Sequence, residues 1–374
     1  MTMTSLVVSL TFVILTLAAN QLGPRLIAIF MADRQIQTVL GLFLGTILYV
    51  LMVLRTIDDE LGEEGVPHIA VTVGSGLTIL CLFALLWYVH KIARSIIADN
   101  VVERVASDVG ANLREILRAP QHAASESQPA PDLAGAASVS LGKSGYIQTI
   151  DYNALVKVAE RSNAVLTIEV RAGHFLLQHG AHVRVHPAGA LDEAGTAAIR
   201  AAFVIGRERT PAQDLEFGIR QLVEIALRAL SPGINDPFTA IAVIDRLGAV
   251  LEQALLLGLQ PRVLMDDAGH VRVVADRTEV HGLIDAAFDL IREAASAHPS
   301  VLIRIADCLG QLAPVLSSAD ARRAVGDQLA KLAQTAERGP IAPSDRDDVT
   351  ERIERARRAV IAAGEATSDR TDGP

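Results

Sequence analysis

The chain has 374 residues, half of them hydrophobic but only 4% aromatic, and its formal net charge is −9 at pH 7. This length accommodates a membrane part together with one or two soluble domains. The acidic balance argues against a nucleic-acid-binding protein, because neutralising phosphates requires a basic surface. The two cysteines, Cys81 and Cys308, have no ligand-spaced partners, which argues against a disulfide or a zinc site.

The most apolar stretch of the chain, residues 66–89, contains no Asp, Glu, Lys or Arg. It is long enough to cross the hydrocarbon core of a bilayer as a helix. Trp87 and Tyr88 stand at its end, where amphipathic rings favour the headgroup layer, and Lys91 and Arg94 follow. The alternative, a buried helix of a large soluble protein, is disfavoured by the length and the asymmetric flanks. The segment therefore predicts a membrane-spanning helix.

Two earlier segments, residues 1–19 and 38–54, predict further spans. The first lacks the basic start and the cleavage site of a signal peptide, so we interpret it as a membrane helix. The loop 20–37 and the residues after 90 are basic, whereas the loop 55–65 is acidic. The positive-inside rule then places the basic parts in the cytoplasm and residue 1 outside. We therefore expect that this sequence has a truncated start and that a fourth span precedes it.

Small and polar residues within these segments are candidates for a pore lining or for helix packing. At helical periodicity the polar residues of the first segment share one side, and the later spans contain a GxxxG and a GSG sequence. The polar side either lines a water-filled path or packs against another helix. We favour helix packing, because no charge lies among these residues. The candidates are Ser5, Ser9, Thr16, Asn20, Gly41, Gly45, Gly74 and Gly76.

The remainder of the chain predicts a soluble part. After the membrane α-helical bundle that is expected over residues 1–90, an amphipathic stalk helix is expected over 91–118. A disordered linker rich in Ala, Ser and Pro is expected over 119–140. A cytoplasmic α+β domain is expected next, then a helical C-terminal region and a disordered tail. The expected bounds of these last three parts are 141–260, 261–363 and 364–374.

Local patterns inside the predicted α+β domain indicate its first elements. GYIQTI and AVLTIEV have the composition of strands, and Asp151 is placed to cap a helix between them. HFLLQHGAHVRVH predicts a β-hairpin that turns near His179 and Gly180. Strand alternation divides the histidines of this segment between two faces, and no carboxylate lies among them. We therefore expect neither a metal nor another cofactor.

The densest stretch of the soluble part is GRERTPAQDLEFGIRQLVEIALRALSPGINDPFTA. Thr210 and Gln213 fit a capping box, with Pro211 as the first residue of a helix. Several charged residues remain unexplained by capping. They form a salt-bridged network, a contact between subunits, or an anion site at the helix start. The candidate interface or ligand residues are Arg207, Arg209, Asp214, Glu216, Arg220, Asn235 and Asp236.

Several long strings resemble a family of bacterial predicted membrane proteins, domain of unknown function 2254. They are QLGPRLIAIFMADRQIQTVLGLFLGTILYVLMVLR, SGYIQTIDYNALVKVA, RAGHFLLQHGA and RTPAQDLEFGIRQLVEIALRALSPGINDPFTA. The resemblance extends to residue 260 and implies a membrane half of four helices followed by a cytoplasmic half. The family has no assigned activity, so the resemblance implies no catalytic residues.

Three classes of function compete. No GxSxG, HExxH, P-loop or GxGxxG motif occurs, so we do not expect an enzyme. The first expectation is an oligomeric channel or small-solute transport protein of the inner membrane, with a cytoplasmic regulatory domain. Three or four helices per chain are too few to surround a pore, and several subunits would be needed. The expected partners are therefore further copies of this chain, in a homo-oligomer, and the lipid bilayer. The alternative is a membrane-anchored sensor or scaffold that binds a ligand or a protein partner.

Overall fold

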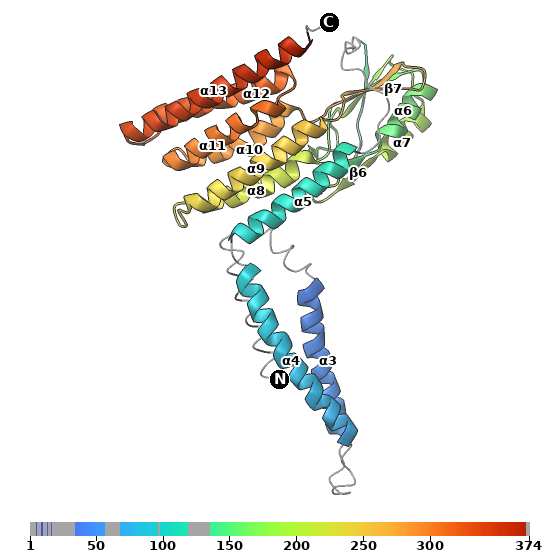
Figure 1. The fold of residues 1–374 in the computed structure, drawn as a ribbon. Helices are drawn as coiled ribbons and strands as arrows, with labels where there is room; N and C mark the ends of the chain where they lie inside the picture. The colour runs from blue at the N-terminus through green and yellow to red at the C-terminus, as the bar shows by residue number, and fades with distance from the viewer. Residues whose placement is uncertain are drawn as a thin grey trace. The chain divides into compact units, whose positions relative to one another are not determined.

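The computed structural model describes residues 34–56, 68–95, 98–118 and 135–371, and the single positions Ser5, Ser9, Val13 and Thr16. The chain divides into two compact units, one of residues 1–103 with 231–235 and one of residues 104–230 with 236–374 (Figure 1). Most of the predicted span 1–19, Asn20 and the first part of the predicted linker lie outside the described residues. The four single positions are helical.

The first unit contains two long apolar helices, α3 (Arg34–Thr56) and α4 (His68–Ser95). Residues 37–55 and 68–90 within them are long and apolar enough to cross a membrane. Most of these side chains are exposed in the single chain, whereas the core helix of a soluble protein is mostly buried. This confirms the predicted segments 38–54 and 66–89 as candidate membrane helices.

A small core holds α3 against α4. Its buried members are Val39, Phe43, Cys81, Leu85 and Tyr88. Thr46 Oγ1 lies 3.3 Å from Cys81 Sγ, and the Tyr49 hydroxyl donates a hydrogen bond of 3.0 Å to the Ala70 carbonyl oxygen. Polar contacts of this kind are a usual means of fixing helix pairs in lipid.

The second unit contains two β-sheets. The larger has the strand order β1-β5-β3-β8-β7, and β3 and β8 run parallel while the other neighbours run antiparallel. Its strands are β1 (Ala137–Val139), β3 (Val165–Ile168), β5 (Val183–His186), β7 (Val263–Met265) and β8 (Val271–Ala275). The smaller, antiparallel sheet has the order β4-β2-β6, with β2 (Gly145–Ile150), β4 (Phe175–Leu176) and β6 (Phe203–Gly206).

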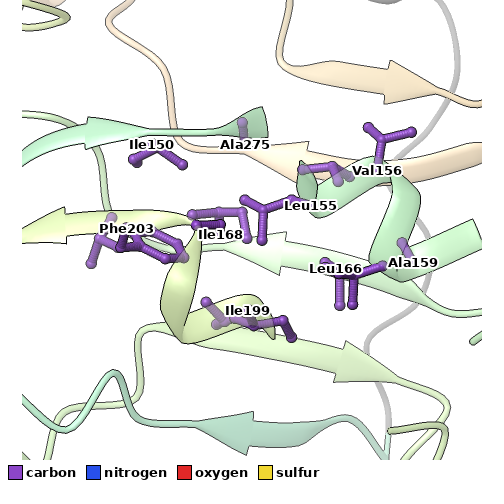
Figure 2. Close-up of a cluster of buried hydrophobic side chains, with 14 of the residues drawn as sticks. Ile150, Leu155, Val156, Ala159, Leu166, Ile168, Ile199, Phe203 and Ala275 are labelled. Atoms are coloured by element: carbon purple, nitrogen blue, oxygen red, sulfur yellow. The ribbon is translucent and has the colours of Figure 1, made fainter. Parts of the chain in front are cut away.

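Two short helices, α6 (Tyr152–Arg161) and α7 (Glu193–Ala201), pack with these strands around one hydrophobic core (Figure 2). Asp151 accepts a hydrogen bond of 2.9 Å from the Ala154 amide, so the predicted cap of α6 is confirmed. Ile168 from β3 and Leu155 from α6 meet in the centre of this core, each with at most 1% of its surface exposed. Alternating burial along β2 and β3 follows from the two-residue period of a strand.

The sheets correct two expectations. β4 pairs with β2, whereas β5 pairs with β1 and β3, so the predicted hairpin near His179 and Gly180 is wrong. Local alternation indicated two strands correctly, but not that they belong to different sheets. β7 and β8 complete the larger sheet beyond residue 260, where the α+β domain was expected to end. β1 lies inside residues 119–140, so the predicted linker is wrong at its last residues.

Six helices form three helical hairpins stacked on one another, the pairs α8–α9, α10–α11 and α12–α13 (Figure 1). Their bounds are α8 (Leu215–Ala229), α9 (Pro237–Leu257), α10 (Val280–Ala294), α11 (Pro299–Gln311), α12 (Ala319–Arg338) and α13 (Pro343–Thr371). A 3-10 turn, η3 (Ala313–Val315), follows α11. Because α13 continues to Thr371, the disordered tail predicted from residue 364 is wrong over that range.

The helix α5 (Ala98–Arg118) lies where the amphipathic stalk was expected. Its apolar residues Val109, Leu113 and Ile116 are buried, and Val109 lies directly over Gly218 of α8. A Cβ atom on Gly218 would clash with Val109, so glycine permits this close approach. From residue 104 onward α5 is therefore part of the second unit and not an isolated stalk.

Candidate functional site

The start of α8 differs from the predicted capping box. The helix begins at Leu215 with Asp214 as its cap, and Asp214 Oδ1 accepts a hydrogen bond of 3.1 Å from the Phe217 amide. Gln213 instead holds the end of β2, since its side chain pairs with both backbone groups of Ile150 at 2.8 and 3.2 Å. A carboxylate already occupies this helix start, which disfavours the anion site considered there.

Glu216 in the first turn of α8 is the centre of a network of ion pairs. It is 6% exposed, and its two carboxylate oxygens accept hydrogen bonds of 2.8 Å from Arg171 and from Arg220. Burial alone would raise the pKa of Glu216, but the two guanidinium groups together lower it. Arg171 also donates to Asp276, with a closest contact of 3.1 Å. Four charged side chains thus neutralise one another within one chain.

A second ion pair, with a buried carboxylate and a half-buried arginine, lies next to it. Arg209 Nε and Nη2 both donate to Asp214 Oδ2, at 2.8 and 2.5 Å, and this is the edge of the guanidinium that binds carboxylates side-on. Burial nevertheless raises the pKa of Asp214 above its usual value. Gly173 lies against this pair with a φ of +90°, where a Cβ atom would meet both Asp214 and Arg209.

The topology of the larger sheet brings this network together. Arg171 follows β3 and Asp276 follows β8, and these strands are parallel neighbours. The carboxyl ends of parallel strands meet at one edge of a sheet, which is where ligands bind in open α/β sheets. The Asp276 amide donates to the Ile168 carbonyl oxygen at 2.9 Å, which fixes the register at this edge. His174 Nδ1 lies 3.9 Å from Asp276, and burial lowers the pKa of this histidine.

A small cavity opens beside the network. The cavity has a volume of about 20 Å³, which is enough for one group of the size of a water molecule. No acidic side chain of the described residues lines it, so the charge on its wall comes from arginine. The lining residues are Tyr152, Arg171, Ala172, Gln213, Leu215, Gln260, Arg277 and Thr278.

Arg277 is the least satisfied charged group of this cavity. Its guanidinium carbon lies 3.7 Å from the centre of the Tyr152 ring, and Nη1 donates to Gln260 Oε1. Nε and Nη2 are buried without a hydrogen-bond partner in the part of the chain that the structure describes. A buried donor left in this state costs about 1–3 kcal/mol, and more if it is charged. Burial lowers the pKa of Arg277, although arginine keeps its charge in proteins.

Gln260 connects the cavity to α5. Its Nε2 donates a hydrogen bond of 2.7 Å to the Ile116 carbonyl oxygen, near the end of α5. The amide must therefore direct Oε1 toward Arg277, because only the oxygen accepts from a guanidinium. One side chain thus bridges the cavity and the helix that follows α4 along the chain.

The structure distributes the sequence-predicted residues as follows. Arg209, Asp214, Glu216 and Arg220 gather at the network, whereas Arg207 is exposed and forms no ion pair with the described residues. The other two, Asn235 and Asp236, lie in the turn between α8 and α9. Asp236 caps α9 as predicted, with Pro237 in the first turn, and accepts from the Thr239 hydroxyl at 2.6 Å. Asn235 precedes it with a φ of +51°, which asparagine tolerates.

The membrane candidates that are described also have distinct surroundings. Ser5, Ser9 and Thr16 are exposed. A Cβ atom added to Gly74 would lie 3.5 Å from the ring of Tyr49. At Gly41, Gly45 and Gly76 such a Cβ would meet nothing within 4 Å among the described residues. Of the four glycines, Gly74 is thus the one placed at the α3–α4 contact.

Sequence reasoning missed Arg171, Tyr152, Gln260, Asp276 and Arg277. The available signal was a charged residue directly after a buried strand, in EVRAG and in VVADR. That signal becomes useful only when β3 and β8 are known to be parallel neighbours. Arg171 and Asp276 are 105 residues apart, and no local pattern indicates that pairing.

Comparisons with known proteins agree with the architecture. The family described as predicted membrane protein (DUF2254) matches residues 1–311. An uncharacterised protein of Mycobacterium bovis and one of Mycobacterium tuberculosis are each 29% identical over 367 residues, which is 96% of this chain and 70% of each relative. No solved structure matches. With two apolar helices and a family match over most of its length, the chain belongs to the DUF2254 family of predicted membrane proteins.

Proposed function

We propose that this protein is a membrane-anchored sensor whose soluble unit binds a small ligand in the cavity beside Arg277. The observation that carries the proposal is Arg277, which lines a cavity at the carboxyl ends of β3 and β8 and whose Nε and Nη2 are buried without a partner among the described residues. We assign the cavity to binding and not to catalysis, because its described lining contains no pair of a nucleophile and a base.

The bond from Gln260 to α5 supports a sensing role. A ligand that engages Arg277 acts on a side chain that Gln260 holds, and Gln260 also holds the Ile116 carbonyl oxygen. Two residues separate the end of α4 at Ser95 from the start of α5 at Ala98, so the membrane helix is joined along the chain to the helix that Gln260 holds. We place the soluble unit in the cytoplasm and α3 and α4 in the inner membrane, on the basis of the basic and acidic loops.

The test is a thermal unfolding screen of the full-length protein in detergent micelles, followed by circular dichroism. Defined neutral, cationic and anionic small molecules are added separately. We expect at least one class to raise the unfolding midpoint saturably, since a ligand at 100 times its Kd stabilises by about 2.7 kcal/mol. Gln260→Ala should weaken the effect, and Leu256→Ala, at a residue 69% exposed, should not. A wild-type midpoint unmoved by every class contradicts the proposal.

An oligomeric channel is the second candidate. It is favoured by the helical and exposed state of Ser5, Ser9 and Thr16 in the single chain, which leaves this polar side for a pore or for a neighbouring subunit. A pore predicts flux of ions or a small solute through liposomes that contain the full-length protein. Ser9→Leu combined with Thr16→Val should abolish the flux, and the absence of wild-type flux argues against a pore.

A further inference from the structure

The guanidinium of Arg277 presents one particular edge without a partner. The two unpaired nitrogen atoms are Nε and Nη2, whereas Nη1 is bonded to Gln260. Nε and Nη2 together form the side-on fork that donates hydrogen bonds to two oxygen atoms of one oxyanion. In the same unit Arg209 uses these two atoms to hold one carboxylate oxygen, Oδ2 of Asp214. At Arg277 the corresponding carboxylate is missing from the described residues.

We propose that the Nε–Nη2 edge of Arg277 binds one carboxylate or phosphate group of a small anionic ligand. The inference rests on the proposed function and names its ligand class. Tyr152 lies over the guanidinium plane and Gln260 holds its far side, so the fork is already oriented before a ligand arrives. A pre-oriented fork loses less side-chain entropy on binding than a flexible lysine would.

The charges around the cavity are compatible with an anion. Arg171 and Arg277 both line it, and the acids Asp276 and Glu216 are already paired with Arg171. Arg220 also pairs with Glu216, so the sum over these five groups is one positive charge, that of Arg277. A bound monoanion neutralises this charge where burial makes it costly.

The size of the cavity limits how the anion enters. With a volume of about 20 Å³ the cavity holds about one water-sized group, so a terminal carboxylate or the end of a phosphate monoester enters only as the lining side chains move apart. The rest of a larger ligand then remains outside the cavity. A single buried water molecule is the competing occupant, and the test below separates it from an anion.

The test compares inorganic phosphate, acetate and chloride at equal ionic strength, with the full-length protein in a phosphate-free detergent. The readout is the thermal unfolding midpoint together with its dependence on anion concentration. We expect phosphate or acetate to raise the wild-type midpoint saturably, and chloride to give a smaller shift. Arg277→Lys keeps the charge but loses the fork, and should weaken binding at least ~10-fold.

Matched variants keep the result interpretable. Arg323→Gln removes an exposed arginine from the same unit and should leave the anion effect unchanged. Arg277→Gln should abolish the effect, and Arg277→Lys covers the case in which that variant does not fold. Equal wild-type shifts by all three salts, or shifts that persist in Arg277→Lys, would overturn the oxyanion site and leave water as the occupant.

The outcomes also separate this inference from the proposed function. If a neutral molecule, but no oxyanion, stabilises the wild type through Gln260, the cavity binds a ligand and the oxyanion assignment is wrong. If no molecule of any class stabilises it, both fail. Adding phosphatidylglycerol to delipidated protein identifies the source of the anion. Stabilisation by this lipid but not by free phosphate would show that the site binds a lipid headgroup, and would contradict the proposal that a free small anion is the ligand.

Discussion

Gly173 is the residue whose backbone most directly supports the ion pairs of the site. Its φ of +90° and its contact with Asp214 and Arg209 leave no room for a Cβ atom. Gly189 has a similar φ of +85°, but nothing lies within 4 Å of an added Cβ. The two glycines therefore share backbone strain and differ in steric contact.

We expect Gly173→Ala to destabilise the protein by about 2 kcal/mol more than Gly189→Ala. Both variants introduce alanine at positive φ, but only the first displaces a buried carboxylate from its arginine. Chemical denaturation of the two variants measures the difference in the free energy of unfolding. Equal losses of stability would show that the Arg209–Asp214 pair adjusts without cost.

The stability of the soluble unit should also depend on pH through His182. This residue is 4% exposed, and its Nδ1 accepts a hydrogen bond of 3.1 Å from the Leu141 amide, which requires a neutral imidazole. Burial lowers its pKa, so the unfolded state binds more protons than the folded state below the ordinary pKa of about 6.5. Stability from this group is present above that value and is lost as the pH falls.

We therefore expect the denaturation midpoint of the wild type to fall between pH 7 and pH 5, and to fall less in His182→Gln. Glutamine keeps an acceptor for the Leu141 amide but does not titrate. His174, whose pKa is also lowered, and Glu216 contribute slopes of the same sign, so part of the pH dependence should remain. Identical slopes in the two proteins would contradict the role of His182.

At the scale of elements, the caps of α8 and α9 allow a matched comparison. Asp214 and Asp236 each accept backbone amides at the start of a helix. Asp236→Ala should cost about 1 kcal/mol, the usual value of a lost cap. Asp214→Ala also leaves Arg209 without its carboxylate, and should cost about 3 kcal/mol or more.

A double-mutant cycle isolates the extra cost. In Arg209→Ala/Asp214→Ala no charge is left unpaired, so its loss of stability should be smaller than the sum of the single losses. Urea denaturation of the three variants provides the numbers. Additive losses would mean that the pair contributes nothing beyond the cap.

The elements that sequence predicted well are those with local signals. Asp151 and Asp236 identify helix starts because capping depends on residues only two or three positions away. Thr210 and Gln213 fit the same grammar, yet Gln213 is used by Ile150, 63 residues earlier in the chain. The parallel pairing of β3 with β8 is a contact of this long-range kind. The candidate site was therefore predictable at α8 but not at Arg171 or Arg277.

At the scale of the whole molecule, the charge of the loops is the reason why we propose a cytoplasmic soluble unit. The native cysteines, Cys81 and Cys308, are both buried, and burial raises the pKa of Cys308 to about 12, so neither should react readily. Ser317 is exposed and suits a single reporter thiol.

A membrane-impermeant maleimide should fail to label Ser317→Cys in intact cells and should label it after permeabilisation. This result is expected if the soluble unit lies in the cytoplasm. The wild type should remain unlabelled in both conditions, which controls for the native thiols. Labelling of intact cells would place the unit outside and reverse the orientation.

The central claim is that a membrane-anchored chain carries an oxyanion site at Arg277. The most direct measurement is a high-resolution density map of the full-length protein in a lipid nanodisc with saturating phosphate or acetate. We expect density for an oxyanion within hydrogen-bond distance of both Nε and Nη2. Density for a lone water there, or a protein carboxylate already bonded to that edge, would contradict it.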